Sequence, residues 1–154
     1  MATYTVDASV FLNAFNPYEL GHAESRDLLA QMQEQGAPVI VPTLLLPEVA
    51  AAVARGRDDA DLARRFAAAL GRLPHLVFVP LDDTLARQAS DVAAQHRLRG
   101  SDAVYAAVAF RFGATLVTLD QEQQRRVAAV IPARSPAEVL AEWNGDVIDG
   151  PNRP

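Results

Sequence analysis

Four acidic residues stand far apart in the chain, each at the boundary of an expected strand or helix: Asp7, Glu48, Asp102 and Asp120. Asp7 and Asp120 directly follow short apolar runs typical of strands, and the carboxyl ends of parallel strands open onto the crevice where ligands bind. Asp102 falls in the first turn of an expected helix, where the helix dipole favours a negative charge. Glu48 also lies near a helix start. We therefore expect the four side chains to meet at one edge of a sheet.

The chemistry that such a cluster predicts is metal-dependent hydrolysis. Carboxylates that converge raise one another's pKa, and a hard divalent cation removes that cost. Ligands that are all oxygen favour Mg²⁺ or Mn²⁺. A bound metal polarises a phosphoryl oxygen and lowers the pKa of a bound water, and one metal or two would serve. The four acids are therefore the candidate catalytic and metal-binding residues for cleavage of a phosphodiester, with no need for a histidine or lysine base.

Composition narrows the function classes. The 154 residues fit one domain with a real core, and the net charge of −5 argues against a general nucleic-acid coat protein. The chain has no cysteine, which excludes disulfides and thiol catalysis, and its fourteen cationic side chains are all arginine, which excludes Schiff-base chemistry. No apolar run is long enough to cross a membrane, and the N-terminus lacks the pattern of a signal peptide. We expect a cytoplasmic protein.

Short apolar runs alternate with helical patterns along the chain. Strands are expected at 3–7, 38–41, 76–80, 114–119 and 127–131. Helices are expected at 8–15, 22–35, 43–55, 58–73, 82–97, 101–113, 121–126 and 135–143. Ser101 is expected to cap its helix, and Ser135 and Glu138 to form a capping box. This alternation predicts an α/β fold, a parallel sheet covered by helices on both faces. Residues 1–143 form the domain, and 144–154, rich in Gly, Asp and Pro, are expected to be a flexible tail.

Four short motifs, in order, resemble those of the PIN domain family. They are Val6-Asp7-Ala8-Ser9, Pro47-Glu48-Val49, Gly100-Ser101-Asp102-Ala103 and Leu116-Val117-Thr118-Leu119-Asp120. The resemblance extends from residue 3 to about 143 and is greatest to the VapC-type toxins of toxin–antitoxin pairs. It implies a five-stranded parallel sheet and a ribonuclease dependent on Mg²⁺ or Mn²⁺.

The resemblance also implies roles for single residues and for partners. Asp7 and Asp102 are the leading metal ligands, and Glu48 and Asp120 complete the site directly or through water. Ser9 and Thr118 match positions where a hydroxyl often supports the acids. The last motif departs from many relatives, which have a polar residue before the final acid and another acid soon after it; Glu122 is the candidate for that further acid. The partners implied are an RNA substrate, a cognate antitoxin and a second copy of the chain.

The sequence is also compatible with other functions. A PIN-like module that binds RNA or protein without cleaving it is the main alternative. A receiver or phosphatase domain also places acids at strand ends, but it relies on a lysine that this chain does not have. Arg97 and Arg99, just before Asp102, are candidates for contacts with RNA phosphates.

Overall fold

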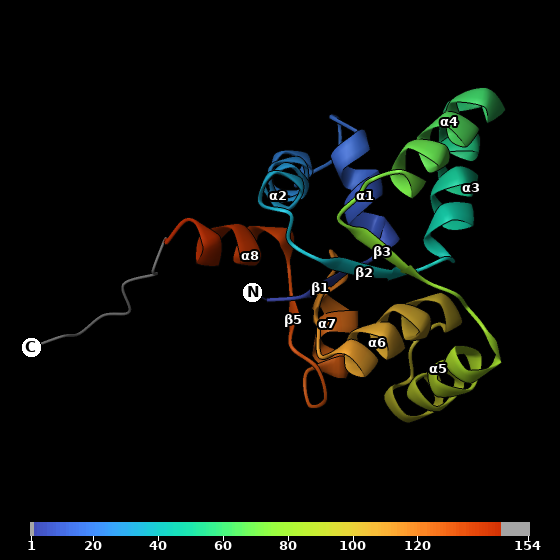
Figure 1. The fold of residues 1–154 in the computed structure, drawn as a ribbon, viewed down its shortest axis with the longest axis vertical. Coiled ribbons are helices and arrows are strands. Elements are labelled where there is room, and N and C mark those ends of the chain that lie inside the picture. Colours follow the sequence, from blue (N-terminus) through green and yellow to red (C-terminus); the bar gives the residue numbers. More distant parts are fainter. Residues whose placement is uncertain (1, 146–154) are drawn as a thin grey trace, which may run out of the picture.

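The computed structural model describes residues 2–145, which form a parallel sheet between two layers of helices (Figure 1). The strands are β1 (Tyr4–Val6), β2 (Val39–Pro42), β3 (Leu76–Val79), β4 (Thr115–Val117) and β5 (Ala133–Arg134). Their order in the sheet is β3-β2-β1-β4-β5, and every pairing between neighbours is parallel. The α/β class and the five-stranded parallel sheet expected from the sequence are confirmed.

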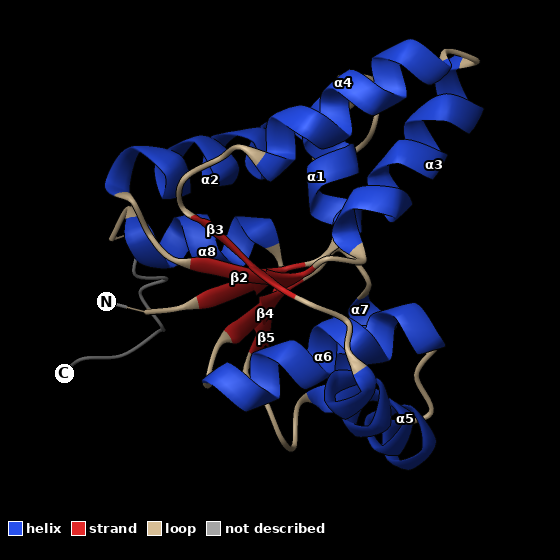
Figure 2. Cartoon of the chain, turned by 45° about the vertical axis from the view of Figure 1, so that its right-hand side comes forward, coloured by secondary structure: helices blue, strands red, loops and turns tan. Residues whose placement is uncertain are grey.

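Helices cover both faces of the sheet, as the alternation predicted (Figure 2). One layer holds α1 (Ala8–Phe15), α2 (His22–Gln35), α3 (Leu45–Arg57), α4 (Ala60–Gly71) and α8 (Pro136–Trp143). The other holds α5 (Asp83–His96), α6 (Gly100–Phe112) and α7 (Gln121–Val127). No helix within residues 2–145 is long and apolar enough to span a membrane.

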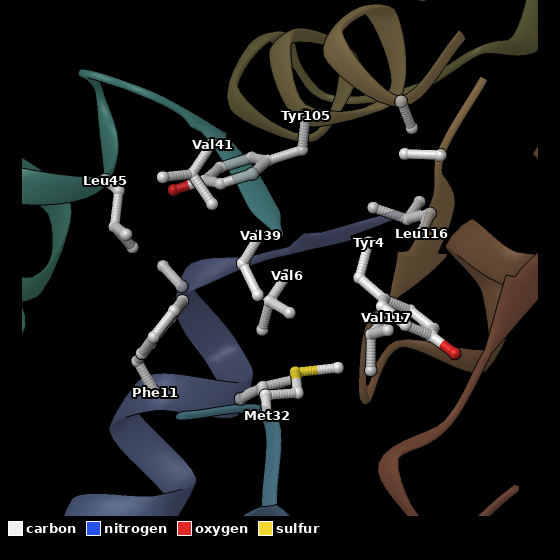
Figure 3. Close-up of a cluster of buried hydrophobic side chains, with 14 of the residues drawn as sticks. Tyr4, Val6, Phe11, Met32, Val39, Val41, Leu45, Tyr105, Leu116 and Val117 are labelled. Carbon is white, nitrogen blue, oxygen red and sulfur yellow. The ribbon is translucent and has the colours of Figure 1, made fainter. Parts of the chain in front are cut away.

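Helix α6 is the most deeply buried of these elements. Residues 103–109 are all buried, because this stretch of small and apolar side chains packs against β1, β2 and β4 as well as against α5. Tyr105 enters the core between the helix layer and the sheet, where its ring lies beside Val41 (Figure 3). Such burial on all sides holds α6 rigidly, so the residues of its first turn are fixed relative to the strands.

The sheet topology creates one crevice at its carboxyl edge. The chain runs from β1 outward through β2 to β3 and then returns to place β4 on the other side of β1. The strand order therefore reverses between β1 and β4, which is the position where open α/β sheets bind ligands. Asp7 follows β1 there, and Thr118 and Asp120 follow β4.

Two sequence-based expectations about elements are wrong. Ser101 lies within α6, and the N-cap is Arg99, whose side chain turns toward Asp102. The segment 127–131 is not the fifth strand. Val127 ends α7, the N–H groups of Val130 and Ile131 donate to its carbonyl, and β5 pairs with β4 only at Ala133–Arg134.

The start of the last helix agrees with its prediction. Helix α8 begins with the expected capping box of Ser135 and Glu138, with Pro136 in its first turn. Most of the expected flexible tail, residues 146–154, lies outside the described residues.

Candidate functional site

Asp7 is the most buried carboxylate of the site, with 5% of its surface exposed. It is the N-cap of α1, and its Oδ1 accepts hydrogen bonds from the backbone N–H of Ser9, at 3.1 Å, and from the Ser9 hydroxyl. Burial raises the pKa of Asp7 from 3.8 to about 6, against the opposing effect of the Ser9 and Thr118 hydroxyls; the charge of Asp102 raises it further. The fold thus holds a carboxylate where its negative charge is costly.

Glu48 reaches the same region from the first turn of α3. The Tyr105 hydroxyl donates to its Oε1 at 2.7 Å, which links α3 to the buried helix α6. Partial burial raises the pKa of Glu48, the bond from Tyr105 lowers it, and the charge of Asp102 raises it. Tyr105 therefore holds the Glu48 carboxylate in place.

Asp102 and Asp120 share one cation. Arg99 Nε lies 3.1 Å from Asp102 Oδ2, and Arg99 Nη2 lies 3.4 Å from Asp120 Oδ2. Asp120 is also the N-cap of α7, because its Oδ1 accepts from the N–H groups of Glu122 and Gln123. Capping uses one carboxylate oxygen and leaves the other for a cation, so the two roles are compatible.

The structure thus brings the four predicted acids together in pairs. Asp102 acts electrostatically on both Asp7 and Glu48, and Arg99 joins it to Asp120. Within residues 2–145, no group of three or more acidic, histidine or cysteine side chains is arranged so that it could hold a metal ion. The site with four metal ligands therefore stays a prediction.

Ser9 and Thr118, the two predicted supporting residues, both form hydrogen bonds at the crevice. Besides its bonds to Asp7, the Ser9 hydroxyl accepts from the N–H of Leu119 at 3.4 Å, so it joins the ends of β1 and β4. The Thr118 hydroxyl accepts from the Asp120 N–H at 3.1 Å and donates to Gln123 Oε1 at 2.9 Å. Both hydroxyls hold the carboxylates of the crevice in place.

A pocket of about 280 Å³ opens beside Asp102 and Asp120. The residues that line it are Arg97, Leu98, Arg99, Asp102, Asp120, Glu122, Gln123 and Arg126. Glu122, the candidate for a further acid, accepts from both Arg125 and Arg126. The pocket therefore combines two of the acids with three arginines, a pairing that suits a phosphate held next to a cation.

The sequence did not predict two features of this site. They are the contact of Tyr105 with Glu48 and the bridge that Arg99 forms between Asp102 and Asp120. Tyr105 is buried in the core, as an aromatic residue in an apolar helix would be, but its hydroxyl also donates to Glu48. One signal was present for Arg99: an arginine three residues before an acid in a first helical turn can fold back on that acid. Its second partner, Asp120, comes from a distant element and was out of reach.

The donor chemistry of the crevice fits a hard divalent cation. Every candidate ligand is a carboxylate, and carboxylate oxygens suit Mg²⁺ and Mn²⁺. Arg99 already places a positive charge between two of these groups, which shows that they attract a cation at this point. A cation would also relieve the repulsion that Asp102 exerts on Asp7 and on Glu48.

Comparison with known proteins agrees with this architecture. The model of the PIN domain family matches residues 4–130. Among solved structures, the chain is similar to the toxin VapC20 of Mycobacterium tuberculosis. VapC20 shares 20% identity and has a TM-score of 0.69, over 85% of this chain and 98% of that one. The next is VapBC2 of Rickettsia felis, at 13% identity and 0.66, over 86% and 98%.

A third similar structure is PAE2754 of Pyrobaculum aerophilum. Its identity is 23% and its TM-score 0.65, over 94% of this chain and 96% of that one. Among curated protein sequences, none matches the chain. The fold and the acidic crevice define a single α/β domain with its site at the switch point of the sheet. The chain belongs to the PIN domain family, and its fold is that of the VapC proteins.

Proposed function

We propose that the chain is a metal-dependent ribonuclease of the VapC type, the toxin of a toxin–antitoxin pair. The observation that carries the proposal is that Asp102 is linked to each of the other three acids. Its charge acts on Asp7 and on Glu48, and its ion pair with Arg99 reaches Asp120. Supporting it, VapC20 is described as a toxin that cleaves the sarcin–ricin loop.

In this proposal Asp7, Glu48, Asp102 and Asp120 hold Mg²⁺ or Mn²⁺. When bound, the metal would act as a Lewis acid and would activate a water molecule as the nucleophile. The chain's own residues orient the ligands: Ser9 fixes Asp7, and Tyr105 fixes Glu48. The arginines of the adjacent pocket bind phosphates of the RNA strand and so place the scissile bond.

The direct test is cleavage of structured RNA during titration with Mn²⁺, using a sarcin–ricin loop hairpin and total RNA as substrates. We expect cleavage that rises with Mn²⁺ and stops on addition of EDTA. A chain that binds these RNAs but leaves them intact at every Mn²⁺ concentration would favour the alternative, a PIN-like module without catalysis.

An antitoxin partner is the second part of the proposal. Structural neighbours include the VapBC complex of Salmonella typhimurium and the FitAB complex, both bound to DNA. In this chain, Tyr18 and Leu20 are 92% and 99% exposed on the loop between α1 and α2. The buried Asn13 holds that loop, because its Nδ2 donates to Glu19 and to the Leu20 carbonyl. These exposed large side chains on a well-held loop support a protein interaction surface at this place.

Leu20→Ser is expected to weaken antitoxin binding about tenfold, because an apolar anchor is lost from the interface. The partner to test is the product of the small reading frame expected directly upstream of the gene, and the measurement is its affinity for the purified chain. RNA cleavage by Leu20→Ser in the absence of antitoxin should equal that of the wild type. An unchanged antitoxin affinity would exclude this loop from the interface.

Self-association is the third part. An apolar groove of about 180 Å³ lies where α5, α6 and the end of α7 meet, and Phe110, which is 63% exposed, lines it. We expect Phe110→Ser to convert a dimer into a monomer, measured as molar mass by light scattering, because burial of this ring contributes to the dimer interface. Leu20→Ser is the matched control and should stay dimeric. A Phe110→Ser chain with the mass of the wild type would exclude this groove as the interface.

A further inference from the structure

Arg99 is placed differently from the other arginines of the pocket. It is the N-cap residue of α6, with an extended backbone, and its side chain is 79% exposed. Arg126 is held by Glu122 and by the backbone carbonyl of Arg97. The partners of Arg99 are instead two of the candidate metal ligands, Asp102 and Asp120. Arg99 is therefore the cation of the crevice in this structure.

The geometry of the two ion pairs shows what Arg99 does there. One guanidinium spans carboxylates from two elements that are distant in the sequence, the first turn of α6 and the N-cap of α7. A planar fork can bridge two carboxylates in this way, whereas a point charge cannot do so equally well. Both acids present Oδ2 to the guanidinium, and Asp120 Oδ1 is already used to cap α7. A cation at Asp120 would therefore compete with Arg99 for the remaining oxygen.

We propose that Arg99 competes with the metal for Asp102 and Asp120, and that metal binding releases its guanidinium to an RNA phosphate in the adjacent pocket. This inference rests on the proposed function, since it takes the acids to be metal ligands. In the metal-free chain Arg99 keeps the two carboxylates paired. In the loaded chain it is a positioning residue for the substrate.

Charge and solvent exposure both favour the replacement of Arg99 by a metal ion at the two acids. A divalent ion attracts each carboxylate more strongly than a single guanidinium charge at a similar distance. The Arg99 side chain is largely in solvent, so little packing holds it in place, whereas Asp102 is only 20% exposed and stays. Arg99 already lines the pocket together with Arg97 and Arg126, so a released guanidinium stays within it, and a guanidinium is well suited to bind phosphate through two donors.

The test measures Mn²⁺ affinity by calorimetry for the wild type, Arg99→Ala and Arg99→Lys. Arg87→Ala is the matched control, because Arg87 is 78% exposed, pairs with Asp83 one turn away on α5 and does not line the pocket described above. Arg87→Ala shows how much the loss of one positive charge alone changes the Mn²⁺ affinity. We expect Arg99→Ala to bind Mn²⁺ about five- to tenfold more tightly than Arg87→Ala, with Arg99→Lys in between.

The second measurement is the affinity for a fluorescein-labelled RNA hairpin in Ca²⁺, with the RNA checked by gel to be intact. Here Arg99→Ala is expected to bind about tenfold more weakly, because a charged hydrogen bond to phosphate is lost. The two affinities should therefore change in opposite directions. A residue with a merely structural role would lower both.

The outcomes separate this inference from the proposed function. Equal Mn²⁺ affinities of Arg99→Ala and Arg87→Ala would overturn the competition, as would a fall in both the Mn²⁺ and the RNA affinity of Arg99→Ala. If the wild type binds Mn²⁺ while Arg99 has no effect, only this inference fails. If neither the wild type nor Arg99→Ala binds Mn²⁺, the metal site fails and the proposed function fails with it.

Discussion

Replacing Asp7 by Asn is expected to lower RNA cleavage about 10²- to 10³-fold in saturating Mn²⁺. The loss of one group that stabilises developing charge in an active site has an effect of this size. Asn keeps the shape of the side chain and an Oδ1 that can accept from Ser9, so the start of α1 is preserved. What the substitution removes is the negative charge at the centre of the crevice. The measurement is kcat/KM for an RNA hairpin cut by the wild type.

The matched control for this experiment is Glu34→Gln. Glu34 is an exposed residue of α2, and its replacement also removes one negative charge from the chain. It should cleave as the wild type does. Equal cleavage by Asp7→Asn and the wild type would contradict the proposed metal-dependent nuclease, because the activity would then belong to another site or to a contaminating nuclease.

The elements that carry the acids could be predicted from the sequence because their signals are local. Helix α1 begins at Ala8 and α2 spans His22–Gln35, as expected, since a strand ending on Asp7 and a glycine at position 36 mark their limits. The placement of Asp7 and Asp120 followed from parallel topology alone. Parallel strands end at one edge, and the acids follow the two strands that flank the switch point.

The errors arose where tertiary contacts outweighed local preference. Ser101 is a good N-cap residue, but a cap is worth only about 1 kcal/mol, and the chain instead places Arg99 at the cap with its side chain on Asp102. The run from Val127 to Ile131 is apolar enough for a buried strand or for the buried end of a helix, and composition does not distinguish the two. Pairing with β4 decides the position of β5.

The links between the acids could not be predicted, because they join residues far apart in the chain. The bond from Tyr105 to Glu48 spans 57 residues, and the ion pair from Arg99 to Asp120 spans 21. Both depend on how α6 is placed relative to α3 and α7, which only the packed core determines. These same links give the site its electrostatics, so the chemistry of the crevice is a property of the fold as much as of its motifs.

The second large effect is on stability, and it comes from the burial of Asp7. The carboxyl has a pKa near 3.8 ordinarily and about 6 in the folded chain, so the folded state holds its proton more tightly. As the pH rises from about 4 to above 6, the unfolded state ionises first, and the free energy of unfolding falls. The difference between the two pKa values corresponds to about 3 kcal/mol at most. Glu48, whose pKa is also raised by burial, acts in the same direction.

In EDTA, Asp7→Asn is therefore expected to be more stable than the wild type at pH 8 and equal to it near pH 4. For a chain of this length, 3 kcal/mol corresponds to a rise in Tm of roughly 6–12 °C. The measurement is thermal unfolding at several pH values, with Glu34→Gln as the control for net charge. Millimolar Mn²⁺ should then raise the Tm of the wild type, by mass action, and leave that of Asp7→Asn nearly unchanged. The wild type could instead have the same Tm at pH 4.5 and pH 8 and show no response to Mn²⁺. Burial of the Asp7 carboxylate would then not destabilise the fold, and Asp7 would not be a metal ligand.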